Sequence, residues 1–244
     1  MPVSETEAYL ALRFNRNGQT GWWINRATVF AMALGRRAVP LFDVIGLGRD
    51  SYAPMPDGGY HLKFDECGWY CIPGTMQPVD RMTSPINGRT IKVQHYRSPN
   101  ETVLRDGKIV LTRQMPEGVE IDPVRGPLLA DSGQVWMSDD LFVRSPRKVL
   151  PEVLSANPAA AWNVQTSLAT YNARRADLLA FRNHWVPATC AYQTMASWRP
   201  WFDADEVPGV MSLRMHGTKV ASAAEIPEPL LSLVRAQHPD LLKA

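Results

Sequence analysis

The sequence predicts an α+β protein with a β-rich centre, and three observations lead to this class. A capping-box pattern, Ser4-Glu5-Thr6-Glu7, stands at the start of the chain and indicates the beginning of a helix. Residues 39–145 break into short apolar runs separated by Pro, Gly, Asp and Asn, which is typical of strands and turns. After Pro146 the apolar residues recur at helical spacing. We therefore expect N-terminal helices, a Pro/Gly-interrupted curled sheet or partly open barrel, and a C-terminal helical region.

Residues 1–38 are expected to form the N-terminal helices. The Ser4 hydroxyl and the Glu7 carboxylate can satisfy free amide groups at a first turn, which predicts a helix over residues 5–14. Residues 15–21 are rich in Asn and Gly, which tolerate positive φ, and indicate a loop. Residues 22–36 place apolar side chains at helical spacing and predict a second helix.

Residues 39–145 are expected to supply the sheet. Arg105-Asp106-Gly107-Lys108 is a two-residue hairpin signal, because Asp-Gly adopts the positive φ angles of a tight turn. The many prolines favour edge positions and long connections, so a large regular sheet is not expected. The candidate strands are 39–45, 59–64, 68–72, 89–97, 101–105, 108–113, 134–137 and 140–144.

Residues 146–244 are expected to be mainly helical. Proline at a first helical position supports helices that start after Asn157 and at Pro187. The predicted helices are 147–155, 158–184, 187–199 and 227–238, with a small hairpin near 209–221. The segments 1–38, 39–145 and 146–244 are the candidate domains, and one compact domain is the alternative.

The composition is that of a globular protein. The chain has 244 residues, of which 45% are hydrophobic and 20% are charged, so it can bury a sizeable core. No apolar run reaches the roughly 18 residues of a membrane-spanning helix, and acids stand where a signal peptide carries cations. Three cysteines are too few for a secreted disulfide framework of this length. We expect a cytoplasmic protein with no membrane partner.

The formal net charge of +2 is unevenly distributed along the chain. Residues 1–100 and 156–202 are basic, whereas residues 101–155 and 203–244 are acidic. Most of the cations are arginines, whose planar guanidinium makes forked contacts with phosphate and stacks on rings. A GC-rich genome would produce the same arginine bias, so charge alone does not identify an acidic ligand.

The sequence has no strong enzyme or cofactor motif. Gly46-Leu47-Gly48 lacks the third glycine of a dinucleotide fingerprint, because Ser51 takes that place. A nuclease site could be built from Asp139-Asp140 or Asp106-Gly107-Lys108, and a zinc site from Cys67 and Cys71 with His61. These groups have plainer interpretations as turns and core residues. We expect no catalytic residue, no cofactor and no bound metal.

The most coherent pattern is aromatic residues interleaved with cations on segments expected to be exposed. Such surfaces bind single-stranded nucleic acid, because rings stack on bases at about 1–3 kcal/mol each and cations follow the phosphates. In the stretch Ile-Lys-Val-Gln-His-Tyr-Arg-Ser, Ile91 and Val93 should face a core, while Lys92 and Tyr96 face outward beside Arg97. The candidate nucleic-acid-binding residues are Trp22, Trp23, Arg26, Lys63, Trp69, Tyr70, Lys92, Tyr96, Arg97, Arg105, Lys108, Arg174, Arg175 and Arg182.

These observations predict a non-enzymatic protein that binds nucleic acid and prefers single-stranded DNA, as an accessory factor in replication or transcription with a partner such as a polymerase. A protein-docking module is the first alternative, since the Trp, Tyr and Arg residues of segment 158–202 are usual interface anchors. A metal-dependent nuclease is the second alternative. Each aromatic residue can instead belong to the core.

Overall fold

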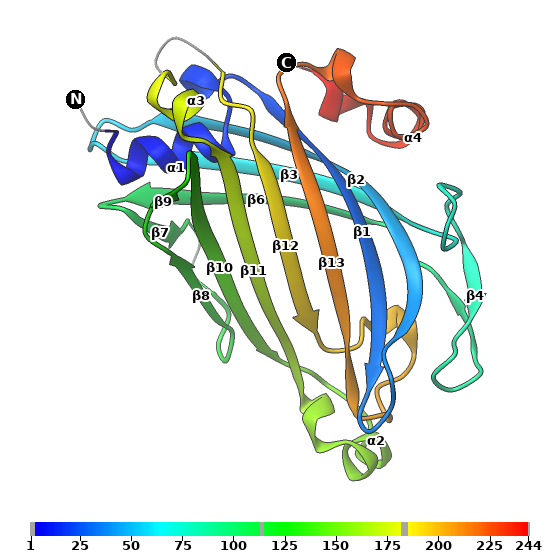
Figure 1. The fold of residues 1–244 in the computed structure, drawn as a ribbon. Helices are drawn as coiled ribbons and strands as arrows, with labels where there is room; N and C mark the ends of the chain where they lie inside the picture. The colour runs from blue at the N-terminus through cyan, green and yellow to red at the C-terminus, as the bar shows by residue number, and fades with distance from the viewer. Residues whose placement is uncertain (1–2, 113–114, 182–184, 244) are drawn as a thin grey trace.

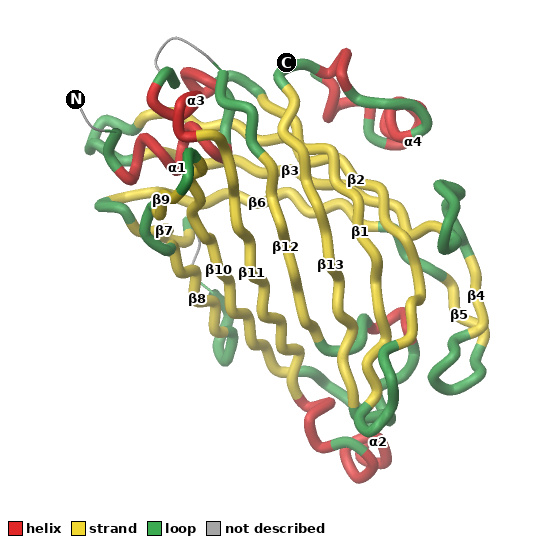
Figure 2. Tube along the Cα trace, in the orientation of Figure 1, coloured by secondary structure: helices red, strands yellow, loops and turns green. Residues whose placement is uncertain are grey.

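Antiparallel strands make up most of the molecule, and helices are few (Figure 2). The computed structural model describes residues 3–112, 115–181 and 185–243. The strands are β1 (Gly21–Ala33), β2 (Val39–Pro54), β3 (Tyr60–Cys71), β4 (Arg81–Thr83), β5 (Thr90–Lys92), β6 (Tyr96–Arg105), β7 (Lys108–Leu111), β8 (Glu120–Arg125), β9 (Leu129–Asp131), β10 (Gln134–Pro146), β11 (Trp162–Arg174), β12 (Thr189–Ala196) and β13 (Gly209–Val220). The α-helices are α1 (Glu5–Arg13), α2 (Pro151–Ala156), α3 (Arg175–Leu179) and α4 (Leu230–Gln237), and short 3-10 turns cover 16–18, 158–161, 200–202, 223–225 and 239–242.

One antiparallel sheet curls around the centre of the molecule in the order β7-β6-β3-β2-β1-β13-β12-β11-β10-β8, with β9 also paired to β10 (Figure 1). The two edges of this sheet approach each other, since Gly107 in the β6–β7 turn lies against the guanidinium of Arg125 on β8. The sheet is therefore a nearly closed barrel. Strands β4 and β5 form a separate small sheet beside it.

Helix α1 fills one end of the barrel. The predicted capping box is confirmed: the Glu7 amide donates to the Ser4 hydroxyl at 3.2 Å, and the Ser4 amide donates to the Glu7 carboxylate at 2.9 Å. The inner side of the helix buries Tyr9 and Leu12 completely. These side chains pack with inward-facing residues of β1, β3, β6, β10 and β11, so strands from both sides of the barrel meet at the helix.

Two further cores complete the fold. At the other end of the barrel, Phe42, Tyr70, Trp198 and Phe202 pack together on the inner face. On the outer face, α4 and the C-terminal turn cover Trp22, Leu47, Trp69 and their neighbours. The strands near α4 are thus apolar on both faces. Among the described residues, no helix has the length and apolar character needed to cross a membrane.

Several elements confirm the sequence-based prediction. The Arg105–Lys108 hairpin joins β6 to β7, with φ of 49° at Asp106 and 75° at Gly107. The helix predicted at 227–238 is α4. Candidate strands 59–64 and 68–72 are two parts of β3, and 134–137 and 140–144 are two parts of β10.

The predicted helices over 22–36, 158–184 and 187–199 are wrong, because these segments contain the strands β1, β11 and β12. Apolar residues lie on both faces of β1, which imitates helical spacing. In β11, buried Ser167, Ala169, Tyr171 and Ala173 alternate with more exposed residues, which is the period of a strand. The C-terminal part is therefore mainly strand, and the hairpin expected near 209–221 is the single strand β13. Strands from all three candidate domains pair within one sheet.

The stretch 91–98 follows its predicted pattern only in its first half. Ile91 and Val93 are buried and Lys92 is exposed, as predicted. Tyr96 was expected to share the face of Lys92, and this is wrong, because β5 ends at Lys92 and the new strand β6 begins at Tyr96. The Tyr96 ring points into the barrel and lies over Gly68.

We expect Leu12→Ala to lower the free energy of unfolding by about 2–5 kcal/mol, because Leu12 is completely buried where α1 meets the barrel. Urea denaturation measures this change. Leu34→Ala is the matched control, since Leu34 is 80% exposed, and it should change the stability by less than about 0.5 kcal/mol. Equal effects of the two substitutions would contradict the role of α1 as the plug of the barrel.

Candidate functional site

A row of small residues crosses the inner face of the barrel between its two packed ends. Gly68, Gly46, Asn25, Gly217 and Cys190 are successive cross-strand neighbours on β3, β2, β1, β13 and β12. A Cβ atom at Gly68 would lie 2.5 Å from the ring of Tyr96, so only glycine lets this ring lie against the sheet. The row leaves more room inside the barrel than the aromatic residues at either end.

Glu66 lies on the inner face beside this row. Its Cγ atom is 3.7 Å from the position that a Cβ atom would take at Gly48. Glu66 is exposed to solvent. Its carboxyl group is nevertheless surrounded by protein, and this burial raises its pKa. Both observations hold if the carboxyl group faces solvent-accessible space inside the barrel. Ala27, Tyr192 and Met215, inward-facing on β1, β12 and β13, are likewise only partly buried.

We call this space the inner chamber and define it by Asn25, Asp50, Glu66, Tyr96 and Tyr192. The negative charge of Glu66 raises the pKa values of both Tyr96 and Tyr192, although burial is the largest cause for each. Because Tyr192 lies on β12 and Glu66 on β3, these side chains approach each other across the barrel. The inner chamber therefore brings together residues from five strands, β1, β2, β3, β6 and β12.

Asp50 is the second carboxyl group of the inner chamber. Its Oδ1 atom is 3.9 Å from the Cβ position at Gly48, on the same glycine that Glu66 contacts. Burial raises the pKa of Asp50 to about 7; the charge of Glu66 adds to this rise, whereas Arg13 and Lys219 oppose it. Asp50 can therefore gain and lose a proton near neutral pH, beside a second carboxyl group whose pKa is also raised.

Arg13, at the end of α1, carries positive charge into this end of the barrel. Its guanidinium pairs with Asp139, donates to the Tyr9 hydroxyl at 2.9 Å and lies 3.9 Å from Asp50. The Tyr9 hydroxyl donates to Asp139 at 2.9 Å. The guanidinium also lies 4.0 Å from the centroid of the Phe64 ring. These contacts fix α1 against β2, β3 and β10 and neutralise Asp139.

The wall opposite Glu66 is polar. Tyr192 and Ser167 share a hydrogen bond of 3.0 Å between their hydroxyl groups, and Ser167 donates to Thr194 at 3.2 Å. The buried Oδ1 atom of Asn25 has no hydrogen-bond partner among the described residues. Likewise, no described residue donates a hydrogen bond to Glu66. The inner chamber thus has two acceptors, Asn25 Oδ1 and the Glu66 carboxylate, that a bound molecule could use.

The expected exposure of the aromatic candidates is wrong for four residues. Trp22 and Trp23 are 5% exposed, Tyr70 is 6% exposed and Trp69 is fully buried. Each indole nitrogen donates internally: Trp22 to the Leu241 carbonyl, Trp23 to the Arg13 carbonyl and Trp69 to the Gln237 side chain. The physical reason is that α1 covers Trp23 on one face of the sheet and α4 covers Trp22 and Trp69 on the other, while Tyr70 packs in the core at the far end of the barrel.

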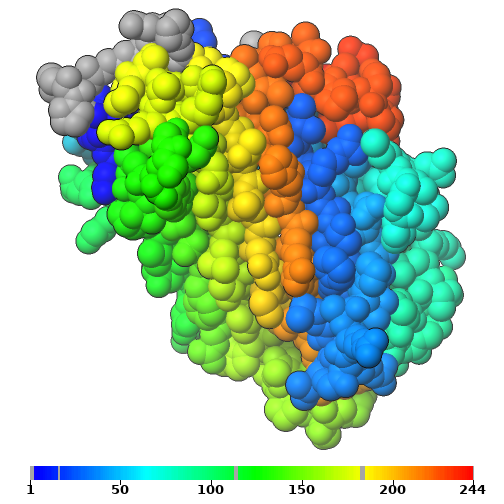
Figure 3. Space-filling view, viewed as in Figure 1, coloured from blue at the N-terminus to red at the C-terminus, as the bar shows by residue number. Residues whose placement is uncertain are grey.

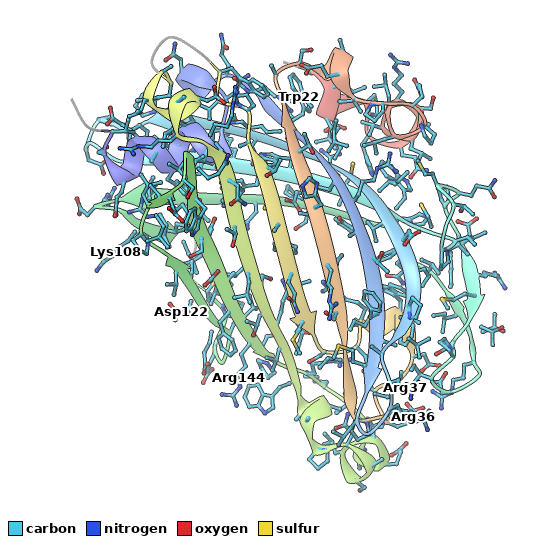
Figure 4. All side chains as sticks on the ribbon, viewed as in Figure 1. Trp22, Arg36, Arg37, Lys108, Asp122 and Arg144 are labelled. Atoms are coloured by element: carbon cyan, nitrogen blue, oxygen red, sulfur yellow. The ribbon has the colours of Figure 1, made fainter. Side chains whose placement is uncertain are left out.

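Four of the nine candidate cations pair with acids. Lys63 pairs with Glu101, Arg97 with Asp65 and Asp240, Arg105 with Asp57, and Arg174 with Asp177. Lys92, Lys108 and Arg175 are exposed, and Arg182 lies outside the described residues. Trp22 lies near α4 while Lys108 lies at the opposite edge of the molecule (Figure 4). The described candidate residues therefore do not form one continuous surface.

The side chains considered for a nuclease site and for a zinc site do not lie together in the structure. Asp139 pairs with Arg13, and the neighbouring Asp140 lies on the opposite face of β10 because adjacent strand residues alternate. Cys67 and Cys71 are buried, whereas His61 lies beside Glu101 at 3.1 Å. Among the described residues, no group of three or more His, Cys, Asp or Glu side chains is placed to hold a metal ion.

The inner chamber was missed at the level of sequence, although one signal was present. Gly46 and Gly48, which the sequence shows as an incomplete dinucleotide fingerprint, both belong to β2, and residues two apart in a strand face the same side. Glycines at this spacing in a strand indicate a close approach by another group. Here that group is Tyr96, Glu66 or Asp50.

The fold and the site define a barrel-like β-protein with a polar chamber on its inner face. Residues 18–244 match the family described as "Protein of unknown function (DUF1838)", and the chain belongs to this family. No curated protein matches the chain. A comparison with solved structures returned an N-terminal dehydratase from the difficidin assembly line, with 8% identity, 90% of this chain and 84% of that chain covered, and a TM-score of 0.13. At this TM-score the two structures do not share a fold that could indicate a function.

We expect Asp50→Asn to change the pH dependence of stability. Folding raises the pKa of Asp50 from about 3.9 to about 7, so this carboxyl group favours the folded state at low pH and loses that contribution as pH rises through about 7. Between pH 5.5 and 8.5, the unfolding free energy of the variant should therefore rise by about 2 kcal/mol relative to the unmodified protein. Urea denaturation at both pH values measures this difference.

Asp122→Asn is the control, because Asp122 is exposed on β8 (Figure 4). This control should follow the unmodified protein at both pH values. An Asp50→Asn variant whose stability ran parallel to the unmodified protein would show that Asp50 ionises normally in the folded state.

Proposed function

We propose that this protein binds a small organic molecule with an apolar body and a basic nitrogen in the inner chamber. The observation that carries the proposal is Glu66, a carboxyl group inside the barrel that touches solvent and accepts no hydrogen bond from the described residues. A carboxylate in such a place gains an ion pair when a cationic ligand enters. Ligand sites commonly combine convergent polar groups with apolar surface, and the polar groups of the inner chamber have Ala27, Leu213 and Met215 beside them on the inner face.

The local charge favours a cation over an anion. Arg13 is engaged by Asp139, and the Lys219 ammonium donates to the carbonyls of Ala11 and Phe14 at 2.6 and 3.1 Å. Burial lowers the pKa of Lys219 to about 7, which reduces its positive charge near neutral pH. Glu66 and Asp50 therefore have no free cation of the protein beside them.

The rings and apolar side chains suit the body of such a ligand. Tyr96 and Tyr70 lie together with their centroids 6.1 Å apart, and the faces of tyrosine rings attract cations. Leu213 and Met215, half-buried on the inner face of β13, offer apolar contact. An aromatic or aliphatic amine matches this surface, because its charged nitrogen suits the tyrosine rings and Glu66 and its body suits the apolar side chains.

Nucleic-acid binding remains a proposal in a narrower form. The four buried aromatic residues cannot stack on bases, and these are Trp22, Trp23, Trp69 and Tyr70. Nucleic-acid binding would then depend on phosphate contacts of the exposed cations Lys92, Lys108 and Arg175. Binding of this kind weakens steeply with salt and does not prefer single strands. A mobility-shift assay with single-stranded and duplex DNA at two salt concentrations tests it, and no shift at low salt would end this proposal.

Benzylamine, benzyl alcohol and benzoate share one ring and differ only in the charge of the head group. We expect saturation-transfer NMR to show binding in the order benzylamine, benzyl alcohol, benzoate, because Glu66 attracts the cation and repels the anion. Glu66→Gln should remove the preference for benzylamine, whereas Glu117→Gln, an exposed control, should keep it.

Ala27→Leu is a second variant that keeps every polar group and reduces the space, since Ala27 is partly exposed on the inner face of β1. It should weaken the binding of benzylamine and benzyl alcohol alike. If benzylamine binds no better than benzoate, or if Glu66→Gln and Glu117→Gln act equally, the proposed ligand site is wrong.

A further inference from the structure

A second site lies on the outer face of the same strands. A groove of about 950 Å³ runs over β11, β12, β13, β1 and β2, with residues 74–76 at one side. The middle of these strands is not covered by a helix in the space-filling view (Figure 3). Side chains alternate along a strand, so the groove-lining residues Arg26, Leu168, Ala191, Arg214 and His216 point away from the inner chamber. The volume lies within the range of small-molecule sites.

Three basic side chains meet in the groove. Arg26 on β1 is the direct cross-strand partner of His216 on β13, and Arg214 is two residues along β13 on the same face. Directly opposite residues have Cβ atoms about 4.5–5.5 Å apart, and diagonal neighbours such as Arg26 and Arg214 about 7–8 Å. Three long or ring-bearing side chains at these separations can contact one anion together.

These three side chains are not neutralised within the part of the chain that the structure describes. Arg26 donates to the sulfur of Met76 at 2.8 Å, and a thioether is a weak and uncharged acceptor. Arg214 lies 5.3 Å from the centroid of the Phe30 ring and pairs with no described acid. In contrast, Arg97 and Arg144 on the same sheet are in ion pairs. Arg26 and Arg214 carry like charges on diagonal positions of neighbouring strands, and a bound anion would offset their repulsion.

Among the described residues that line the groove, Asp43 is the one acid, and it already has hydrogen-bond partners. Asp43 accepts from the Thr28 hydroxyl at 3.1 Å and from the Gly74 amide at 2.7 Å, which holds the 74–76 segment against the strands. Asp43 faces Thr28 across the β1–β2 pair, and Thr28 separates it from Arg214. The end of the groove at Arg26, His216 and Arg214 therefore keeps a positive potential.

The rest of the groove is apolar or weakly polar. Leu168 is 47% exposed, and Thr170 and Ala191 lie beside it in the groove. This surface begins next to the basic residues, because Ala191 on β12 is the direct cross-strand partner of His216, and it continues to Leu168 and Thr170 on β11. A ligand that reaches from the basic residues to Leu168 must have an anionic head and an apolar body.

We propose that the outer groove binds a small organic phosphate, with the phosphate group between Arg26, His216 and Arg214 and its body over Ala191 and Leu168. Guanidinium groups bind phosphate through paired, charge-assisted hydrogen bonds, which a phosphate with three terminal oxygens can accept from more than one side. This site has the opposite charge preference to the inner chamber and does not depend on the function proposed for it.

Phenyl phosphate, inorganic phosphate and phenol separate the contributions of head and body in isothermal titration calorimetry. We expect phenyl phosphate to bind about tenfold more tightly than either of the other two. The double substitution Arg26→Gln/Arg214→Gln should weaken phenyl phosphate by at least about tenfold. The control is Arg36→Gln/Arg37→Gln, two exposed cations at the tip of the β1–β2 turn outside the groove (Figure 4), which should leave the affinity unchanged.

Four results would overturn the assignment. Equal loss in the two double variants would mean that only the overall charge matters. Tighter binding of an oligothymidylate of about 15 nucleotides, lost in Arg26→Gln/Arg214→Gln, would identify a nucleic-acid backbone as the ligand. A dimer in solution that dissociates on Leu168→Asp would make this face an interface between copies. Loss of phenyl phosphate binding in Glu66→Gln would place that ligand in the inner chamber.

Discussion

The position of α1 inside the barrel depends on buried contacts between charged and polar groups at its C-terminal end. The Lys219 ammonium donates to two carbonyls of the last turn, the Trp23 indole donates to the Arg13 carbonyl, and the Arg13 guanidinium pairs with Asp139. A cation at a helix C-terminus satisfies carbonyls that have no partner in the helix and opposes the negative end of the helix dipole. Without these contacts, α1 would not be held in place, and the end of the barrel formed by β1, β2, β10 and β13 would be empty.

The same buried charges determine the chemistry of the inner chamber. Asp50 lies close to Arg13 but does not form a tight pair with it, so burial rather than pairing controls its pKa. Glu66 is farther along the inner face, where the glycines of β2, β3 and β13 leave room. Large side chains fill both ends of the barrel and small ones line its middle, and this distribution places the carboxyl groups beside accessible space.

One set of strands presents two different surfaces. The inner face of β1, β2 and β13 carries Asn25, Asp50 and Lys219, while the outer face of these strands carries Arg26, Asp43 and His216. Because successive side chains point to opposite faces, neighbours in sequence such as Asn25 and Arg26 belong to different sites. A sheet only one layer thick can therefore hold an acidic inner chamber and a basic outer groove.

Local sequence determined the features whose causes lie within a few residues. The capping box at Ser4 and Glu7, the Asp106-Gly107 turn and the alternation of Ile91, Lys92 and Val93 all depend on neighbouring backbone and side-chain geometry. Only the tertiary structure decided that 162–174 and 189–196 are strands, since their partners lie elsewhere in the chain and pairing overrides weak local preference. Tertiary structure also decided which tryptophans are buried, because α1 and α4 cover opposite faces of the sheet. It decided which acids meet as well, because the glycine row crosses strands that pair over long separations in the chain.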